Sequence, residues 1–546
     1  MAPFPIGRRA TLGLTAATAL PLSRAEAQTQ ARGPRGGELR IGMTAADVPT
    51  ARGAPDQGGE GIRWMGFTIY DSLVYWNLNQ EETIPDIVPA LAQKFYPNPQ
   101  DEKEWIFELR RGVAFHDGSP FNADAVIWNI EKILKTDAPQ YDPQQRLTMS
   151  FRMPGIKTWR RIDEYTVGIG SDVPDASMLD QVVFLHISSP EQWRKLGGWA
   201  AFSQKPSGTG PFKVQEIVPR QRAVMVPNES YWDVQRRPKL DRLVLLPLPD
   251  ANTRMAALLS GQVNFIEAPP PDGIEQLRSS GFVVRTNPYP HVWPYILRVS
   301  GENTPLADVR VRRALNLAVD RDEVVTLLGG MAESAYGMVL KSSPWFGNPR
   351  FSIRYDPAEA KRLLAQAGYG PGKPLRITFM ISPSGSGQMQ PLPMNELVQQ
   401  QLAAVGVDLR FSVVEWNAMR GQRSKGPLDP SAREVHALNN SMGTSTPFDA
   451  FFRHFSCDAA PPAGLNWSGV CDPELQPLMD QAARTFDAAE RDKIVAKIHE
   501  RVVDEAYWLW VVHDVNPRGL APEVKGFQQA RSWYQDLTQV YIKKGR

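Results

Sequence analysis

Cysteine and histidine are scarce in this sequence of 546 residues, which contains two cysteines and seven histidines. A tetrahedral metal site needs more ligands than two cysteines without matched histidines can supply. We therefore expect no metal site and no cofactor. In an oxidising compartment the even count favours a disulfide between Cys457 and Cys471 instead. This bond would close a short loop that contains Pro461 and Pro462.

An excess of charge of one sign is also lacking, because the formal net charge is only +2. The first 27 residues carry that +2 through Arg8, Arg9, Arg24 and Glu26, so the rest of the chain is about neutral. Nucleic-acid binding requires clustered positive charge. We therefore expect no nucleic-acid partner.

Long hydrophobic runs are absent, and the stretch Ala10–Leu22 falls short of the roughly 20 apolar residues that a membrane span needs. It follows the basic pair Arg8–Arg9 and precedes the small-x-small site Ala25–Ala27, a pattern that predicts a signal peptide over residues 1–27. The paired arginines favour the twin-arginine export route, with the general route as the alternative. No cysteine lies near the cleavage site to carry a lipid. We expect a periplasmic protein that begins at Gln28.

Catalytic motifs are missing as well. The sequence has no Gly-x-Ser-x-Gly elbow, no phosphate-binding loop and no His-Glu-x-x-His zinc motif. His499–Glu500 comes nearest to the last of these, but Val503 occupies the position of the second histidine. His116 and Asp117 are adjacent on an extended segment, where neighbouring side chains point to opposite faces. We interpret them as a strand end and a turn, and we predict no catalytic residue.

Aromatic residues are abundant, with 15 Trp, 14 Tyr and 22 Phe. Most of them should pack in cores, where aromatic side chains bury large areas. Clusters near Trp64, Trp293 and Trp416 could instead line an apolar cleft with a few polar anchors. The sequence leaves both interpretations open for each cluster.

Strand and helix signals alternate along the whole chain, so the predicted fold class is mixed α/β. Asn122 predicts one helix start, and Asp320 followed by Glu323 predicts another with a capping box. We further expect a short helix over Thr68–Trp76 and a hairpin in which Gly112–His116 pairs with Trp105–Leu109. Other strands are expected at 38–42, 166–169, 212–218, 222–226, 242–246, 375–381 and 408–415, and other helices at 251–259, 309–318, 357–367, 395–404, 473–483 and 488–504.

Four ordered segments are the most informative part of the sequence. They are 107–120 (FELRRGVAFHDGSP), 207–212 (SGTGPF), 228–232 (NESYW) and 309–320 (VRVRRALNLAVD). Alone, each is an ordinary strand, turn or helix. Together they resemble the family 5 extracellular solute-binding proteins of ABC importers, a group with dipeptide-, oligopeptide- and nickel-binding members. Further matches lie at 70–74, 89–92, 261–264 and 487–491, and the resemblance covers Gly37 to about Tyr541.

The resemblance implies a periplasmic binding protein-like fold of type II with an additional inserted lobe. Two main lobes joined by a hinge would enclose a ligand cleft. Lobe I would comprise residues 36–77, 205–294 and 513–546, lobe II the inserted residues 78–204, and lobe III residues 295–512. A monomer of this kind would close on a small-molecule or peptide ligand and deliver it to a membrane permease of an ABC transporter.

Some positions follow the family and others depart from it. Cys457 and Cys471 resemble the cysteine pair of the dipeptide-binding branch, which supports the disulfide. In that branch an aspartate upstream of the cysteines binds the free amino group of the ligand, but Gly443 stands at that position here. Without a carboxylate an ammonium group is costly to enclose, so the amides and hydroxyls nearby suit a neutral or anionic polar ligand. Arg298 replaces a small residue at the crossover and could meet a ligand carboxylate or pair at the hinge.

The expected solute is a peptide or a peptide-like small polar compound. Opine-like conjugates, amino-acid derivatives, oligosaccharides and metal chelates are the alternatives, whereas bare nickel is not expected in a chain with so few clustered histidines. The rival from another class is a secreted hydrolase, and binding of unfolded chains would be a secondary activity. The candidate ligand contacts are Trp293, Ser384, Trp416, Asn439, Asn440 and Ser441.

Overall fold

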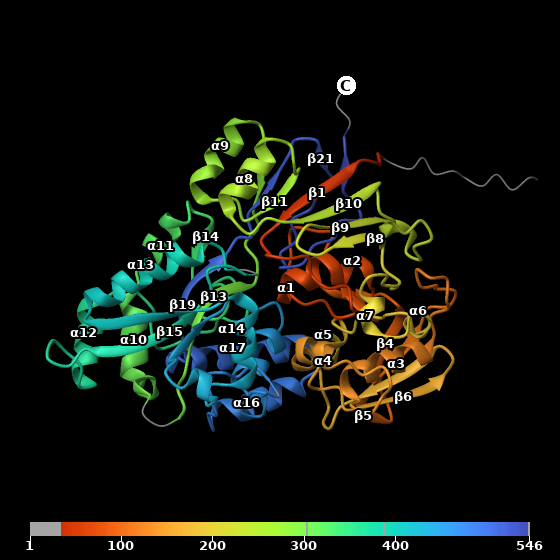
Figure 1. The fold of residues 1–546 in the computed structure, drawn as a ribbon. Helices are drawn as coiled ribbons and strands as arrows, with labels where there is room; N and C mark the ends of the chain where they lie inside the picture. Colours follow the sequence, from red (N-terminus) through yellow and green to blue (C-terminus); the bar gives the residue numbers. More distant parts are fainter. Residues whose placement is uncertain (1–33, 302–303, 386–387, 463, 544–546) are drawn as a thin grey trace, which may run out of the picture. The chain divides into compact units, whose positions relative to one another are not determined.

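Three large β-sheets and two two-stranded sheets organise the chain in the computed structural model of the protein (Figure 1). The structure describes residues 34–301, 304–385, 388–462 and 464–543. The signal peptide expected at residues 1–27 therefore lies outside the described residues. Strands and helices mix throughout the described ranges, which confirms the predicted mixed α/β class.

The first sheet combines strands from three separated stretches of the chain. Its order is β12 (Val283–Arg285), β20 (Arg518–Leu520), β11 (Phe265–Glu267), β1 (Glu38–Met43), β10 (Arg242–Pro247), β9 (Arg222–Pro227) and β8 (Phe212–Val218). β1 runs parallel to β10 and β11, and the remaining pairs are antiparallel. Leu39, Ile41 and Met43 alternate along β1 and are fully buried, as one apolar face of a strand should be. Helices α8 (Ala251–Leu259) and α9 (Ile274–Ser279) lie beside this sheet near β11 (Figure 1).

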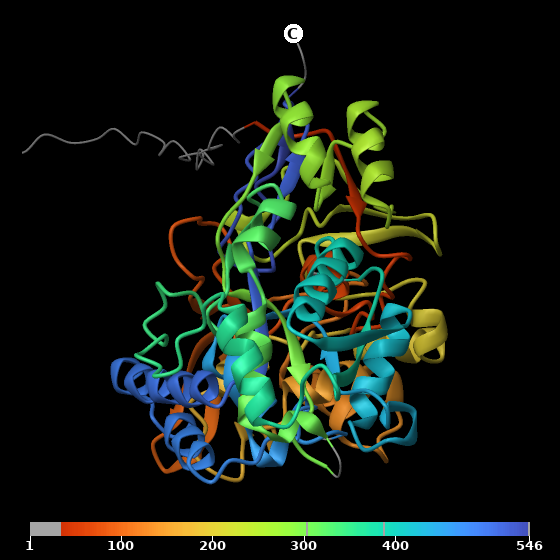
Figure 2. The same cartoon turned by 90° about the vertical axis from the view of Figure 1, so that its left-hand side faces the viewer.

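The second sheet contains the strands nearest the predicted hinge. Its order is β14 (Ala332–Ser334), β19 (Trp508–Asp514), β13 (His291–Leu297), β17 (Ala437–Asn439), β15 (Leu375–Ile381) and β16 (Val407–Val413), and β18 (Met442–Gly443) also pairs with β13. β13 and β19 are antiparallel and fully buried along their whole length. The helices of this region are α10 (Val309–Ala318), α11 (Arg321–Leu327), α12 (Pro357–Gln366), α13 (Pro391–Ala404), α14 (Trp416–Lys425), α16 (Leu475–Ala483) and α17 (Ala488–Asp504). Helices α10 and α11 pack against β19, and α12 packs on α10; the three helices lie near one another in green to teal in Figure 2.

The third sheet is antiparallel throughout, with the order β4 (Ala92–Asn98), β5 (Asp101–Leu109), β7 (Thr166–Gly170) and β6 (Thr158–Asp163). Helix α3 (Ala123–Leu134) packs on it, and the Asn122 side chain accepts a hydrogen bond from the Ala125 amide at 3.1 Å, as the predicted cap requires. The predicted hairpin between Trp105–Leu109 and Gly112–His116 is wrong, because β4 and β7 already occupy both edges of β5.

The remaining elements are short. They are α1 (Gly58–Gly61), η1 (Ile62–Gly66), α2 (Phe67–Ile69), β2 (Val74–Trp76), β3 (Ile87–Pro89), α4 (Pro143–Met149), η2 (Ser150–Arg152), α5 (Met178–Val182), α6 (Pro190–Leu196), α7 (Trp199–Phe202), η3 (Val234–Arg236), η4 (Pro271–Gly273), η5 (Pro305–Ala307), η6 (Pro430–Ala432), η7 (Phe448–Phe452), α15 (Arg453–Phe455), η8 (Cys457–Ala459), β21 (Val524–Lys525) and β22 (Tyr541–Ile542).

The strands of each large sheet can be compared with the predicted lobes. Those of the third sheet lie within the range 78–204, and those of the first sheet lie within the three stretches predicted for lobe I. β13 and β19 pass through the predicted boundaries at 294/295 and 512/513 and belong to the second sheet. The boundaries themselves stay a prediction.

Two of the segments that carried the family resemblance meet at His116. The His116 backbone amide donates to Gly208 O at 2.8 Å, and its ring Nε2 lies 2.9 Å from Gly210 O. The Asp117 amide donates to the Ser207 hydroxyl at 3.1 Å. A Cβ at Gly208 would lie 2.2 Å from a backbone oxygen, so only glycine fits this approach. These contacts support the structural interpretation of His116 and Asp117.

A buried carboxylate, Asp71, joins a third segment to this point. It accepts hydrogen bonds from Thr209 Oγ1 at 3.0 Å, Tyr231 OH at 2.9 Å and Trp232 Nε1 at 2.8 Å. The expected helix over 68–76 is wrong beyond Ile69, because the backbone turns extended at Tyr70 and thereby directs Asp71 toward these donors.

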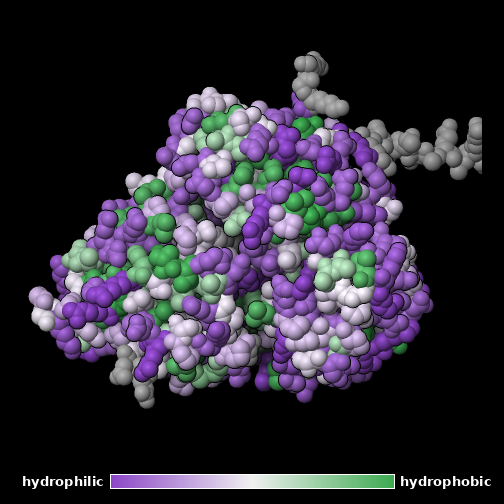
Figure 3. Space-filling view, viewed as in Figure 1, coloured by the Kyte–Doolittle hydropathy of each residue, from purple (hydrophilic) through white to green (hydrophobic). Residues whose placement is uncertain are grey.

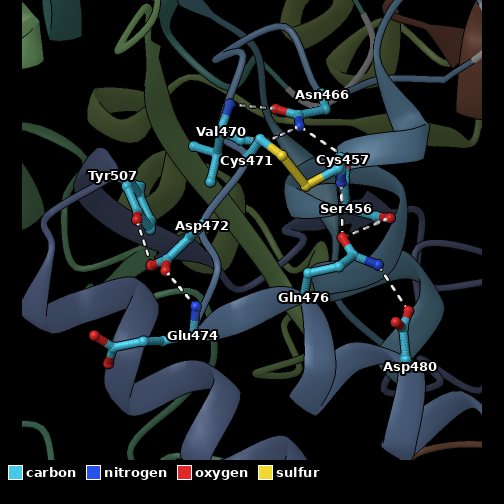
Figure 4. Close-up of a disulfide and its surroundings, with 10 residues drawn as sticks. All are labelled: Ser456, Cys457, Asn466, Val470, Cys471, Asp472, Glu474, Gln476, Asp480 and Tyr507. Carbon is cyan, nitrogen blue, oxygen red and sulfur yellow. Dashed lines mark hydrogen bonds between the residues drawn. A yellow bond between two sulfur atoms is a disulfide. The ribbon is translucent and has the colours of Figure 1, made fainter.

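Cys457 and Cys471 form a disulfide, as predicted (Figure 4). Gln476 accepts hydrogen bonds from the Ser456 hydroxyl at 3.2 Å and from the Cys457 amide at 2.8 Å. The side-chain amide of Asn466 donates to Ser456 O at 2.9 Å from within the closed loop. The loop is therefore held by side-chain hydrogen bonds as well as by the covalent bond.

No helix in the described ranges is both long and apolar enough to cross a membrane. On the face drawn in Figure 3, hydrophobic residues form scattered patches among hydrophilic ones. Singly scattered apolar residues are normal on a protein surface.

We predict that His116→Gln removes a pH-dependent contribution to stability. Burial, with a smaller effect of Lys213, lowers the pKa of His116 to about 4 from its ordinary value of 6.5. The unfolded chain takes up the proton first, so the contribution of neutral His116 is present above pH 6.5 and lost as the pH falls toward 4. The wild-type advantage in free energy of unfolding should fall by up to about 1.4 kcal/mol per pH unit in this window. Urea unfolding of both proteins at several pH values measures it, and a constant difference would contradict it.

We also predict that Cys457→Ser with Cys471→Ser lowers the free energy of unfolding by about 3 kcal/mol, because the unfolded chain regains the entropy of a loop this short. Urea unfolding followed by circular dichroism measures the loss. The wild-type chain in reductant serves as the control and should lose the same amount. Equal midpoints with and without the disulfide would show that it contributes nothing.

Candidate functional site

A pocket lies between segments that belong to the regions of all three large sheets. Its empty space is about 930 Å³, open solvent at the mouth included. The lining comprises Gly58 and Gly59 of α1, Trp76 of β2, Pro85, residues 532–534 of the stretch after β21, residues 151–152 after α4, His291 at the start of β13, and parts of 416–465. Ligand sites favour such places, where separate parts of a chain meet.

Aromatic side chains form much of the wall. Trp76 and Tyr534 stack with their ring centres 5.2 Å apart and an interplanar angle of 7°. Trp533 stacks on His291 at 5.0 Å, and Trp416 begins α14 on the wall contributed by the second-sheet region. Burial lowers the pKa of His291 to about 3, so its ring is neutral near pH 7. These rings provide flat apolar surfaces against which a solute can pack.

A buried ion-pair network fixes Trp533 from behind. The Arg63 guanidinium lies 4.4 Å from the centre of the Trp533 ring and donates to its backbone oxygen at 3.3 Å. Glu267 pairs with Arg63, lies 3.5 Å from Arg518, and accepts from Trp64 Nε1 at 3.1 Å. Arg63 and Arg518 behind this wall therefore share one carboxylate, which is itself hydrogen-bonded.

The pocket itself has a different charge balance. Four arginines line it, namely Arg152, Arg420, Arg423 and Arg453, and Asp449 is the one carboxylate among the described lining residues. Asp449 forms an ion pair with Arg453 at 3.0 Å. Burial and the neighbouring arginines lower the pKa of Arg423 to about 9 and that of Arg420 to about 10, so both stay charged at pH 7. The lining carries a net positive charge.

Amides and hydroxyls follow along 440–445. Asn440 donates its side-chain amide to Ser441 O at 2.7 Å, and β18 places Gly443 opposite His291. A Cβ at Gly443 would lie 3.8 Å from the nearest atom, Pro290 O, which is ordinary contact. Space therefore does not exclude a larger side chain at this position, and glycine leaves the wall without a carboxylate there.

Comparison with known proteins places the chain in a family. The model for bacterial extracellular solute-binding proteins, family 5 Middle, matches residues 86–467. The chain belongs to this family. It is 28% identical over 466 residues to Heme-binding protein A of Haemophilus influenzae, covering 82% of this chain and 83% of the relative. It is 26% identical over 477 residues to the Dipeptide-binding protein of Escherichia coli, covering 84% and 86%.

The fold agrees with this family 5 membership. The ABC transporter-associated periplasmic binding protein DppA from Helicobacter pylori, solved in complex with the peptide STSA, matches with a TM-score of 0.81 and 24% sequence identity. The match covers 94% of this chain and 99% of that chain. The predicted periplasmic binding protein-like fold is confirmed.

The six candidate contacts lie in three different places in this family 5 protein. Trp416, Asn440 and Ser441 come together on the pocket lining. Trp293 is fully buried and donates Nε1 to Gln388 at 3.0 Å. Asn439 is buried and donates to Pro294 O at 3.0 Å. The structure thus places Trp293 and Asn439 in the core of the second sheet, and the part of each residue in ligand binding stays a prediction.

Two further residues lie elsewhere. Ser384 lines a second hollow, beside the start of α13 and near Arg254. Trp533 lines both this hollow and the first pocket. Arg298 is buried and donates to Arg433 O at 3.1 Å, away from the pocket lining. This arrangement favours the second of the two predicted roles for Arg298, a contact within the hinge region.

Sequence reasoning missed the arginines of the pocket. Arg420 lies four residues after Trp416, and Arg423 lies three residues after Arg420, which places all three on one face of a helix. A helix prediction for 416–425 would have drawn attention to that face. Arg152 closes a single turn after α4, and no local pattern marks it.

Proposed function

We propose that this protein is the substrate-binding component of an ABC importer, that it works in the periplasm as a monomer, and that it captures a peptide-like small polar solute. The Escherichia coli relative that binds dipeptides supports the class of solute. The transporter-associated neighbour from Helicobacter pylori, which shares the fold, supports the partnership with a permease.

The observation that carries the proposal is the composition of the pocket wall. The regions of all three sheets contribute to it, through residues such as Tyr534, Arg152 and Trp416. A solute that contacts all three regions at once is bound most tightly when they are close together. Binding therefore favours the closed arrangement, and only differential affinity of this kind can shift such an equilibrium. A permease that recognises the closed arrangement would accept the loaded protein.

The protein acts by enclosure and not by catalysis in this proposal. His116 and Asp117 are engaged by backbone and hydroxyl groups of 207–210, so neither faces a substrate. The pocket offers aromatic faces for packing and amide, hydroxyl and guanidinium groups for hydrogen bonds. Sites with this combination hold small polar solutes in a fixed orientation.

We predict that Trp416→Ala and Asn440→Ala each weaken solute binding at least tenfold, because each removes a wall group that packs on or bonds to the solute. Isothermal titration of the chain from Gln28 with di- to tetrapeptides, glutathione, opines and haemin provides the measurement.

Two surface changes serve as controls for this prediction. Tyr355→Ala and Asn348→Ala alter exposed residues outside the pocket lining and should leave every affinity unchanged. Unchanged affinity in both pocket variants would remove this pocket as the binding site.

A further inference from the structure

Positive charge reaches the pocket from two separate parts of the chain. Arg420 and Arg423 project from α14 beside the second sheet, and Arg152 ends η2 in the stretch between the strands of the third sheet. The charge of Arg152 contributes to lowering the pKa of both α14 arginines, so the groups are near enough to repel one another. Bringing such groups together without an anion between them costs free energy.

No described carboxylate forms an ion pair with Arg152, Arg420 or Arg423, in contrast to Arg453. Asp56 and Glu415 act on Arg420 only from beyond ion-pair distance. Arg152 instead rests against aromatic rings, with its guanidinium 4.6 Å from the centre of Phe184. The rings hold this side chain in place and do not neutralise it.

Several buried donors at the pocket also lack a partner. They are Nε of Arg152, Nε of Arg423, Nε1 of Trp416 and Nε1 of Trp533. A buried donor without a partner is unfavourable, and more so when it is charged. These four atoms are N–H groups, so a solute that supplies acceptor atoms would satisfy them.

We propose that the solute carries at least two anionic groups, such as carboxylates, and that Arg420 and Arg423 bind one of them while Arg152 binds the other from the opposite part of the chain. This inference deepens the proposed function and rests on it. Guanidinium groups hold carboxylates through paired, charge-assisted hydrogen bonds. An anion between the two parts of the chain turns their mutual repulsion into attraction and so favours the closed arrangement.

The pocket wall does not require the solute to carry a free amino group. Gly443 provides no carboxylate, and the one acidic group of the lining, Asp449, is already paired with Arg453. An ammonium group enclosed here would meet positive charge without a counter-ion. A conjugate or peptide with a blocked amine and two carboxylates satisfies the site as well as one with a free amine.

Titration with four matched peptides tests the proposal. Glu-Ala-Glu and Gln-Ala-Gln have nearly the same shape and differ in two carboxylates, and each is used with a free and with an acetylated N-terminus. We expect the glutamate peptides to bind the chain from Gln28 at least tenfold more tightly than the glutamine peptides. Acetylation should change affinity less than threefold.

Variants of α14 locate the effect. Arg420→Gln and Arg423→Gln should each reduce the preference for the glutamate peptides at least threefold. Lys425→Gln removes the same charge from the same helix at an exposed position outside the lining, and it should leave the preference unchanged.

The outcomes separate this inference from the proposed function. Equal affinity for glutamate and glutamine peptides would overturn the inference and leave solute binding standing. If both arginine variants keep the preference for the glutamate peptides, the inference is also overturned, because other residues would then bind the carboxylates. No binding of these peptides or of any solute in the wider panel would overturn the inference and the proposed function together.

Discussion

The antiparallel pairing of β13 with β19 is the interaction on which the rest of the described structure depends. Both strands are buried along their whole length, and they form the centre of the second sheet. The hydroxyl of Tyr289, which precedes β13, donates to Asp514, the last residue of β19, at 2.9 Å, and the chain then enters the first sheet through β20. This pairing therefore joins the two larger sheets and brings His291 and Trp533 to the pocket.

Charge is treated differently on the two sides of Trp533. Behind the ring, Glu267 lies within hydrogen-bonding or ion-pair distance of both Arg63 and Arg518. In front of it, Arg152, Arg420 and Arg423 line the pocket without an ion pair to any described carboxylate. Because uncompensated buried charge is expensive, a folded chain keeps it mainly where a function uses it. The presence or absence of ion pairs therefore distinguishes the structural network behind Trp533 from the pocket wall in front of it.

Local signals predicted much of the fold. Asn122 caps α3 as expected, and the strands at 212–218 and 375–381 have the predicted bounds. The prediction failed where a distant partner decides the conformation. Glu323 was expected to close a capping box, but it accepts from Gln401 of α13, and the Asp320 amide donates to that same side chain. The helix expected through residue 76 ends at Ile69 because Asp71 is bound by residues about 140 to 160 positions away.

The candidate site was predictable only in part, for the same reason. Trp416, Asn440 and Ser441 lie on segments whose composition marked them, and the structure brings them together. Trp293 and Asn439 carry similar chemistry but point into the core of the second sheet. Whether a strand residue faces the core or the pocket depends on register, which the sequence alone did not settle. Arg152 reaches the pocket from a region about 260 residues before α14, and no spacing rule connects positions that far apart.

The central claim, that the arginine-lined pocket encloses a small anionic solute, is tested most directly by native mass spectrometry of the chain from Gln28, purified from a periplasm without denaturation. We expect a discrete added mass on the wild-type chain and on Lys425→Gln, its loss from the double variant Arg420→Gln with Arg423→Gln, and a released compound that migrates as an anion at pH 7. A neutral or cationic compound, or one that the double variant retains equally, would contradict the claim.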